Sequence, residues 1–381
     1  MLLDRRNFLK FLSLGCIASP VAIMTGCTQK TFYDPNQDVL LGGGRFMDNG
    51  RLRYVLAVIN LQKKDKQLVE LDFLAHGIII DPNNKKRLIM FEKIGPGAAE
   101  VDLNKHVVTR KITTQKNRLF YGHGAFNQSG DTLFCTETYI DNQKGIIAIR
   151  DGKTFENLGE FPTYGENPHE CQLVNDGATL VVTNAGSASV NQSQPSVTYI
   201  DVQTQKLSER VTLTNHQINT GHIGIADDGS LIVASAPKDG LDKTHLGGVS
   251  IRSGKQSMLS MTEPDTVVNK MTGEALSVVI DNQRNVAAVT HPDGNMVTFW
   301  SVDKRELIKV MELPKPRGVA LSLDGQSFII SYDLNTSMIM VDTEDLSVAS
   351  DSILQPTYMS GSHIYNWSKR LTEIMPADVY S

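Results

Sequence analysis

The chain has 381 residues, of which 40% are apolar and 21% are charged, and its formal net charge is −5. This length allows two or three average domains or one large repetitive domain. The slight acidic excess excludes a broadly basic surface of the kind that binds nucleic acids, so we expect no nucleic-acid partner.

The first 27 residues are predicted to be an export signal and not part of the fold. The segment "DRRNFLK" carries the paired arginines Arg5 and Arg6 of a twin-arginine signal, and an apolar run follows it. That run, from Phe11 to Met24, is shorter than the roughly 20 residues of an ordinary membrane-spanning helix. We therefore expect the twin-arginine translocase to export the folded chain, which then functions in the periplasm.

The export signal ends in "IMTGC", which resembles a lipoprotein-processing box. We expect a diacyl lipid at Cys27, which would tether the protein to a membrane. Cleavage nearby without a lipid, an uncut anchor and lipid attachment at Cys16 are the alternatives. Twin-arginine export often carries proteins with a cofactor already bound, which favours a bound metal.

A unit of about 47 residues recurs along the rest of the chain. The histidines His76, His123, His169, His222 and His363 follow one another at separations of 47, 46, 53 and 141 residues, and 141 is three times 47. Two further units without the histidine fill the last interval, and they begin with "GEALSVVIDNQ" and "KPRGVALSLDGQ". The spacing predicts a repeat architecture.

Each unit contains four short strand-like runs, and the first two are joined by a turn such as "NQSGD" or "ADDGS". Asp-Gly turns between apolar runs indicate β-hairpins. Four antiparallel strands in a unit of this length are typical of a β-propeller blade. We predict an all-β fold, a seven-bladed propeller whose units begin near His76, His123, His169, His222, Leu276, Gly318 and His363.

The seventh unit has only one strand, "HIYNWSK", before the sequence ends, and its missing strands are found between Gly43 and Phe73. We predict that the C-terminal strand pairs with these N-terminal strands and closes the ring, which leaves no open sheet edge. The expected organisation is a signal over residues 1–27, a tether over residues 28–44, the propeller over residues 45–375 and a tail over residues 376–381.

The first strand of a propeller blade lines the central channel, so the repeat is expected to place five imidazoles around one opening. Flanking glycines, as in "YGHGAF", allow the backbones to crowd near the axis. Loops between second and third strands are expected to bring further side chains to this opening: Glu92, Glu137, His291 and Asp333, together with Arg317. Imidazole and carboxylate groups suit iron, copper or zinc. The metal-ligand candidates are thus His76, His123, His169, His222 and His363, supplemented by Glu92, Glu137 or His291.

Three functions remain open at this point. The first is a non-catalytic propeller that holds a transition metal or presents the histidine face to a partner. The second is a metal-dependent enzyme, either a lactonase-type hydrolase or a redox enzyme, with Glu137 or Glu170 as the catalytic base. The third is a protein-interaction scaffold, in which the histidines only bond to neighbouring blades. Cys135 and Cys171 are expected to be buried thiols, with a disulfide between them as the alternative.

Several segments resemble a bacterial family of exported propellers, labelled domain of unknown function 1513. They are "GHGAF", "GENPHE", "DGATLVVTNAG", "QPSVTYIDVQTQKL" and "VAAVTHPDGNMVTFWSV". Members of that family are often encoded beside imelysin-type lipoproteins and a dihaem-peroxidase-like oxidoreductase. The resemblance therefore implies periplasmic iron acquisition, with iron-uptake proteins as partners, but it supplies no catalytic residues.

Overall fold

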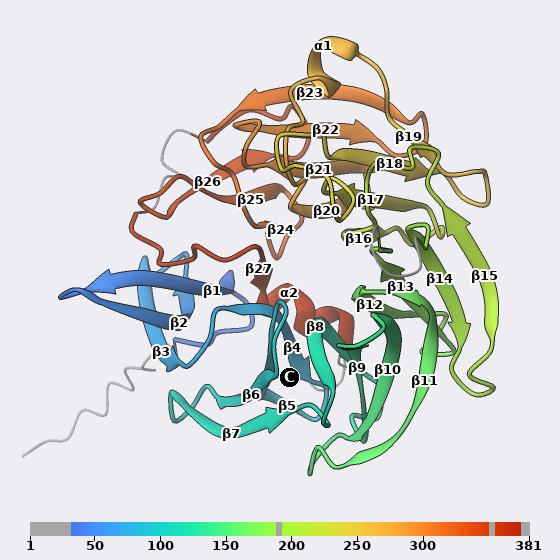
Figure 1. Ribbon diagram of the computed structural model, residues 1–381. Coiled ribbons are helices and arrows are strands. Elements are labelled where there is room, and N and C mark those ends of the chain that lie inside the picture. The colour runs from blue at the N-terminus through green and yellow to red at the C-terminus, as the bar shows by residue number, and fades with distance from the viewer. Residues whose placement is uncertain (1–31, 188–192, 350–354, 375–381) are drawn as a thin grey trace, which may run out of the picture. The chain divides into compact units, whose positions relative to one another are not determined.

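Short apolar runs separated by Asp-Gly and Asn-containing turns fold into antiparallel hairpins throughout the described chain. The computed structural model describes residues 32–187, 193–349 and 355–374. Its seven sheets form the blades of a propeller within the unit Phe32–Ser381, and Figure 1 shows their arrangement around a central channel. The predicted fold class is therefore confirmed. The predicted export and lipidation residues, Arg5, Arg6 and Cys27, lie outside the described residues.

The first three complete blades run consecutively in sequence, and each has four antiparallel strands. Blade 1 consists of β4 (Ala75–Asp81), β5 (Asn84–Glu92), β6 (Gly97–Asp102) and β7 (Val107–Thr113). Blade 2 consists of β8 (Arg118–Phe126), β9 (Thr132–Tyr139), β10 (Lys144–Asp151) and β11 (Asn157–Glu166). Blade 3 consists of β12 (Pro168–Val174), β13 (Thr179–Asn184), β14 (Ser196–Asp201) and β15 (Leu207–Thr212).

The next three blades continue around the ring. Blade 4 consists of β16 (His222–Ile225), β17 (Leu231–Ser235), β18 (Gly248–Arg252) and β19 (Leu259–Ser260), and the short helix α1 (Asp265–Val268) follows it. Blade 5 consists of β20 (Ser277–Asp281), β21 (Val286–His291), β22 (Met296–Ser301) and β23 (Glu306–Glu312). Blade 6 consists of β24 (Val319–Leu321), β25 (Ser327–Tyr332) and β26 (Ser337–Asp342), with an isolated bridge between Val341 and Val348.

Blade 7 joins the two ends of the described chain and confirms the predicted ring closure. Its sheet has the order β27 (Ile364–Asn366), β1 (Val39–Asp48), β2 (Arg51–Asn60) and β3 (Asp65–Leu71). Strand β27 is innermost and pairs with β1 from Leu40↔Asn366 to Gly42↔Ile364. The backbone groups of the first and last strands thus satisfy each other, and the ring has no open edge there.

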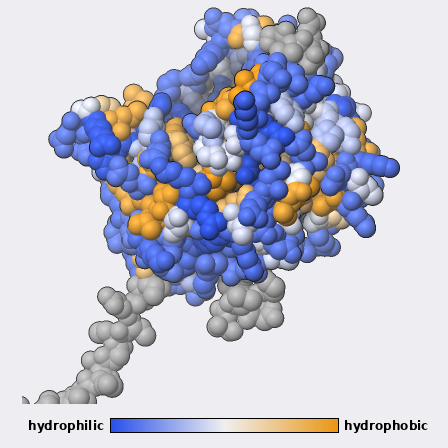
Figure 2. Space-filling model, turned by 60° about the horizontal axis from the view of Figure 1, so that its bottom comes forward, coloured by the Kyte–Doolittle hydropathy of each residue, from blue (hydrophilic) through white to orange (hydrophobic). Residues whose placement is uncertain are grey.

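Apolar side chains fill the spaces between neighbouring blades, as expected for strands that are buried on both faces. The cluster between blades 7 and 1 includes Leu56, Val58, Leu88 and Met90, each fully buried. Trp367, the first residue of the C-terminal helix α2 (Trp367–Ile374), packs into the same cluster. The face shown in Figure 2 is largely hydrophilic, with apolar side chains in separate patches.

Two local expectations differ from the structure. The glycine-rich segment around Gly42 was expected within a tether ending at residue 44, but β1 already begins at Val39. These strand positions need glycine, because a Cβ on Gly43 would collide with the carbonyl oxygen of Ala75 and one on Gly44 with that of Tyr358. The C-terminal strand is also shorter than expected, because α2 follows it directly. No helix among the described residues has the length and apolar character needed to span a membrane.

Candidate metal centre

The repeat places one histidine at the start of each of several innermost strands. His76, His169 and His222 occupy the first or second position of β4, β12 and β16, and His363 directly precedes β27. His123 lies within β8, beside a register shift between Phe120 and Gly124. All five side chains are buried, and none is more than 9% exposed. The structure thus brings the five predicted imidazoles together at one site.

Glycines beside the histidines make this approach of backbones possible. Gly122 has a φ of +111°, a conformation that L side chains rarely adopt. A Cβ at Gly122 would lie 2.8 Å from Cδ2 of His76 and 3.1 Å from Cε1 of His169. A Cβ at Gly77 would collide with the carbonyl oxygen of Gly122. The "GHG" segment therefore leaves room for the side chains of neighbouring blades.

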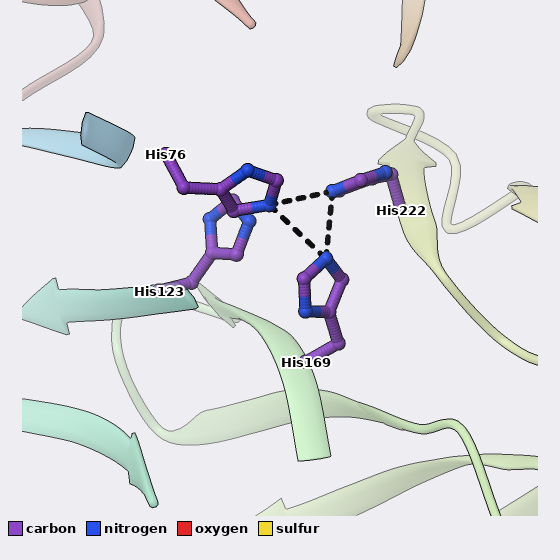
Figure 3. Close-up of side chains that lie close together, drawn as sticks. All are labelled: His76, His123, His169 and His222. Carbon is purple, nitrogen blue, oxygen red and sulfur yellow. Dashed lines mark hydrogen bonds between the residues drawn. The ribbon is translucent and has the colours of Figure 1, made fainter. Parts of the chain in front are cut away.

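Three of the imidazoles point their Nε2 atoms at one another, as Figure 3 shows. The Nε2 atom of His76 lies 3.1 Å from that of His169 and 3.1 Å from that of His222. The Nε2 atoms of His169 and His222 are 2.8 Å apart. With His123 included, four residues each place a ligand nitrogen within 4.8 Å of the others. This is close enough for one metal ion to bind them.

Hydrogen bonding alone cannot satisfy the triangle of Nε2 atoms. A ring nitrogen of neutral imidazole carries either a hydrogen or a lone pair, and a hydrogen bond needs one of each. Among three mutually adjacent nitrogens, at least two must be of the same kind. At least one pair therefore sets hydrogen against hydrogen or lone pair against lone pair. A cation among three lone pairs removes this conflict, because it attracts all of them.

The tautomer of His169 is fixed by its second ring nitrogen. Its Nδ1 lies 2.8 Å from the carbonyl oxygen of Tyr121, which can only accept, so Nδ1 donates the hydrogen. The Nε2 lone pair of neutral His169 consequently faces His76 and His222. Such a bond from the outer nitrogen to a carbonyl commonly orients metal-binding histidines.

Burial keeps the imidazoles neutral. It lowers the pKa of His169 to about 3 and is the largest cause of the lowered pKa of His76, His123, His222 and His363. Neighbouring imidazoles lower the pKa further at His76, His123, His222 and His363, because two positive charges so close together repel each other. At neutral pH these groups are therefore uncharged, which is the form that binds metal.

His363 extends the cluster from the closing blade. Its Nε2 lies 2.8 Å from Nε2 of His222, and its Nδ1 lies 3.3 Å from Oγ of Ser277. Two other ring nitrogens of the cluster are buried with no hydrogen-bond partner among the described residues: Nδ1 of His222 and Nε2 of His123. Such unpaired polar atoms are costly unless a ligand satisfies them.

Two predicted ligands lie outside the cluster, which corrects the sequence expectation. Glu137 is fully buried between blades, where its Oε1 lies 2.6 Å from Nη2 of Arg150 and its Oε2 3.7 Å from Nη1 of Arg118. His291 is also buried, and its Nε2 lies 2.9 Å from Oγ1 of Thr298. Both residues lie near the end of a second strand, but their side chains turn into the protein core and not toward the channel.

Of the remaining candidates, Glu92, Glu170 and Arg317 lie near the cluster and Asp333 does not. Glu92 shares a cavity of about 340 Å³ with His76, and its carboxylate accepts the N–H of Gly97 at 3.3 Å. Glu170 accepts the N–H of Ile223 at 2.9 Å, next to His222, and burial raises its pKa. Arg317 donates from Nε to the carbonyl of Gly361 at 2.9 Å. Asp333 accepts the N–H of Asn335 and so belongs to a turn.

The alternative of a disulfide between Cys135 and Cys171 is wrong, because both are free, buried thiols. Cys135 packs between blades 1 and 2, whereas Cys171 packs between blades 2 and 3. Burial raises the pKa of Cys135 to about 12 and also raises that of Cys171. Neither residue therefore provides a thiolate ligand at neutral pH.

Sequence reasoning missed the residues that orient the histidines. The carbonyl of Tyr121 has no side-chain signal in the sequence, and Ser277 is recognisable only as the residue at the histidine position of blade 5. It also missed α2, whose residues Arg370 and Glu373 line two cavities, one of which also has His222 and His363 in its wall. Figure 1 shows this helix near the centre of the ring.

A family model described as Protein of unknown function (DUF1513) matches residues 69–364. This range is more than half of the chain, so the chain belongs to this family. No sequence among curated proteins matches it significantly.

Solved structures share the fold at low sequence identity. Hydrazine synthase of Kuenenia stuttgartiensis is 14% identical with a TM-score of 0.61, and the match covers 78% of this chain and 93% of that one. Dihydro-heme d1 dehydrogenase NirN, solved in complex with DHE, is 12% identical with a TM-score of 0.57, and the match covers 89% of this chain and 77% of that one. These similarities concern the propeller fold alone.

Proposed function

We propose that this member of the DUF1513 family binds one transition-metal ion at the histidine cluster. The observation that carries the proposal is the triangle of Nε2 atoms of His76, His169 and His222, with edges of 3.1, 3.1 and 2.8 Å. Neutral imidazoles in this arrangement repel or fail to pair unless a cation lies among them. His363 and His123 supply a fourth and a fifth imidazole.

The spacing of the nitrogens favours a metal with more than four ligands. Ligand nitrogens about 2.1 Å from an ion are about 3.0 Å apart at right angles, as in an octahedron, and about 3.4 Å apart in a tetrahedron. The nitrogens of the cluster match the shorter spacing. Iron or copper therefore fits this site better than tetrahedral zinc, and imidazole is a suitable ligand for both.

The cellular part of the proposal rests on the sequence. The twin arginines Arg5 and Arg6 and the processing box at Cys27 support export to the periplasm and a lipid tether to a membrane. There the protein would handle iron or another transition metal together with iron-uptake proteins. The neighbourhood of family genes beside imelysin-type lipoproteins motivates these partners.

A metal-dependent enzyme is a second candidate, favoured by one observation. Glu170 lines a cavity of about 640 Å³ together with His222 and His363. Burial raises the pKa of its carboxyl, as is useful for a general base near neutral pH. Turnover of lactones or peroxides by metal-loaded protein, abolished in Glu170→Gln, would support this reading, and complete inactivity of the loaded protein would refute it.

The metal site can be tested on protein that has matured through its own export route. We expect metal analysis to find about one equivalent of iron, copper or zinc per chain. Because Nε2 of His222 contacts three other imidazoles, His222→Ala should weaken metal binding at least about 100-fold. The matched control is His245→Ala, at an exposed histidine that does not belong to the cluster, which should bind metal as the unchanged protein does.

Two results would overturn the metal site. One is protein that contains no iron, copper or zinc and that binds none when the metals are added. The other is a His222→Ala variant that is folded by circular dichroism and still binds metal as tightly as the unchanged protein.

A further inference from the structure

A cavity of about 640 Å³ connects the histidine cluster with the surface of the propeller. Two of its lining residues, His222 and His363, are buried members of the cluster. Its wall follows the innermost strands β16 and β24 to the turns after them, where the lining residues Asp227 and Asp324 are exposed. The exposed Glu373 of α2 lines the cavity as well. The cavity therefore offers a path from solvent to the imidazoles.

Carboxylates outnumber cationic groups along this path. The charged residues in the cavity wall are five carboxylates against two cations: Glu170, Asp227, Asp281, Asp324 and Glu373 against Lys369 and Arg370. Asp281 also pairs with Arg284, which is 3.0 Å away and outside the wall, and counting this arginine still leaves an excess of two negative charges. A cleft lined mainly by one sign of charge raises the local concentration of ions of the opposite sign. The path therefore attracts cations.

The carboxylates do not form a second metal site of their own. Within the described part of the chain, the one group of three or more ligand atoms that lie within 4.8 Å of one another belongs to His76, His123, His169 and His222. The cavity meets this group at His222, whose Nδ1 is buried without a hydrogen-bond partner among the described residues. The carboxylates thus act on a cation through their field, and the imidazoles are the ligands at the end of the path.

The opposite end of the channel is less suited to the entry of a cation. A cavity of about 340 Å³ reaches His76 there, but its two carboxylates, Asp72 and Glu92, are balanced by two cations, Arg45 and Lys93. Its charge therefore gives a cation no net attraction.

An ion pair also crosses the channel at that end. Nζ of Lys93, which follows β5 in blade 1, lies 2.9 Å from Oε1 of Glu274, which precedes β20 in blade 5. Blades 1 and 5 are not neighbours in the ring, so the pair spans the opening. The cavity of about 730 Å³ has no histidine in its wall and carries only Asp176 and Glu373 against Arg370. The cavity of about 640 Å³ is thus the most acidic of the three, and it contacts the cluster directly.

We propose that the metal reaches the histidine cluster as a hydrated cation through the cavity of about 640 Å³, attracted by the carboxylates along it. Glu170 is the last carboxylate on this path, because it accepts the N–H of Ile223, next to His222, at 2.9 Å. The same path releases the ion. This inference rests on the proposed metal site and specifies in which chemical form, and by which route, that site takes up its metal.

The first test measures how fast Co(II) binds to full-length, metal-free protein, by stopped-flow absorbance at an ionic strength of about 0.1 M. Asp227→Asn and Asp324→Asn each remove one negative charge and keep an oxygen that accepts the hydrogen bond of the turn. Each should lower the association rate constant about twofold, and the double variant at least about threefold. Asp176→Asn is the matched control, because this exposed residue occupies the equivalent turn after β12 and lines the cavity of about 730 Å³. It should leave the rate nearly unchanged.

The second test narrows the path. Val278→Trp, on β20, adds a large side chain to the wall and should slow association and dissociation of Co(II) equally, at least about tenfold. The Kd should stay within about twofold, because a barrier on the path leaves the free and bound states as they are. Ile79→Trp, on β4, is the matched control, since that residue is also half-buried and lines the cavity of about 730 Å³. It should change neither rate.

The third test concerns the form of the metal. Co(II) supplied as its anionic nitrilotriacetate complex should bind at the rate set by the concentration of free Co(II), and a faster rate would contradict entry as a cation.

Two further results would overturn the path but leave the metal site intact. One is an equal effect of Asp324→Asn and Asp176→Asn, or of Val278→Trp and Ile79→Trp. The other is association that Val278→Trp does not slow and Lys93→Gln accelerates, which would place the entrance at the opposite end of the channel. Failure to bind Co(II), iron, copper or zinc at all would refute the metal site, and the path with it.

Discussion

Nε2 of His363 lies 2.8 Å from Nε2 of His222, although the two residues are 141 positions apart in the chain. His363 reaches this position because β27, which follows it directly, pairs with β1 and closes the ring. The histidine cluster and the closure of the propeller therefore depend on the same short segment. A change that loosens the closure is expected to weaken metal binding as well.

The first prediction concerns Gly122, where a side chain would approach the rings of both His76 and His169. In Gly122→Ala the added methyl group would lie 2.8 Å from Cδ2 of His76, and the residue would have to keep a φ of +111°. We expect the free energy of unfolding to fall by about 1–3 kcal/mol and metal binding to weaken at least about tenfold. Urea denaturation and metal titration measure the two effects.

Gly229→Ala is the control for backbone strain, because Gly229 has a φ of +82° but open space around its Cβ position. It should cost about 1 kcal/mol and leave metal binding unchanged. If both variants bind metal equally well, the steric role of Gly122 at the cluster is wrong.

The second prediction is the pH dependence of stability without metal. In the unfolded chain each histidine has a pKa near 6.5, whereas burial lowers the pKa of His169 in the folded protein to about 3. Between these values the unfolded state binds more protons, so stability is complete above about pH 6.5 and falls as the pH decreases toward 3. His169 alone contributes about 1.4 kcal/mol per pH unit in this window, and the other four histidines add losses of the same sign.

Denaturation curves of metal-free protein between pH 7 and 4 measure this dependence. In His169→Gln the free energy of unfolding should change less steeply with pH, by about 1.4 kcal/mol per pH unit, which corresponds to one proton. His245→Gln, at an exposed histidine, should leave this slope unchanged. Added metal should shift the acid transition to lower pH, since it competes with protons for the same nitrogens. A stability that is constant from pH 7 to 4 would contradict the neutral, buried cluster.

The ring of histidines could be predicted from sequence because blade architecture converts a position in the repeat into a position in space. His76 and His222 are 146 residues apart, yet each stands at the start of an innermost strand, and strands of that kind meet at one channel. The prediction needed only the period of the repeat and the hairpin turns.

Side-chain direction could not be obtained in the same way. Glu137 and His291 lie at comparable places near the ends of second strands, and both were predicted from the sequence to face the channel. Both were expected in loops that follow the second strand, but β9 extends to Tyr139 and β21 extends to His291. Side chains on either face of a second strand pack against a neighbouring blade and do not reach the channel. Glu137 on β9 pairs with Arg150 on the adjacent strand β10. The two residues are 13 positions apart, and no sequence motif identifies them as partners.

The third prediction follows from the buried ion pair of Glu137 and Arg150. Glu137→Gln removes the charge that compensates Arg150, so the free energy of unfolding should fall by about 3 kcal/mol. Glu160→Gln should cost less than about 1 kcal/mol, since the Glu160 side chain, which pairs with Arg118, is 34% exposed. Metal binding should remain unchanged in both variants, and a loss of metal in Glu137→Gln would restore Glu137 as a ligand.

The fourth prediction tests the link between closure and metal binding through Trp367. This side chain is fully buried between blades 7 and 1, and its Nε1 donates to the carbonyl of Lys85 at 2.8 Å. Trp367→Ala should lower the free energy of unfolding by about 3–5 kcal/mol, as is typical of a large cavity, and Trp367→Phe by less.

Because Trp367 directly follows β27, the cavity should also loosen His363, so that Trp367→Ala weakens metal binding in conditions where the protein remains folded. Leu334→Ala, at a side chain that is 89% exposed, should change neither stability nor metal binding. A folded Trp367→Ala variant that binds metal as tightly as the unchanged protein would show that the closing strand keeps His363 in place without the helix that follows it.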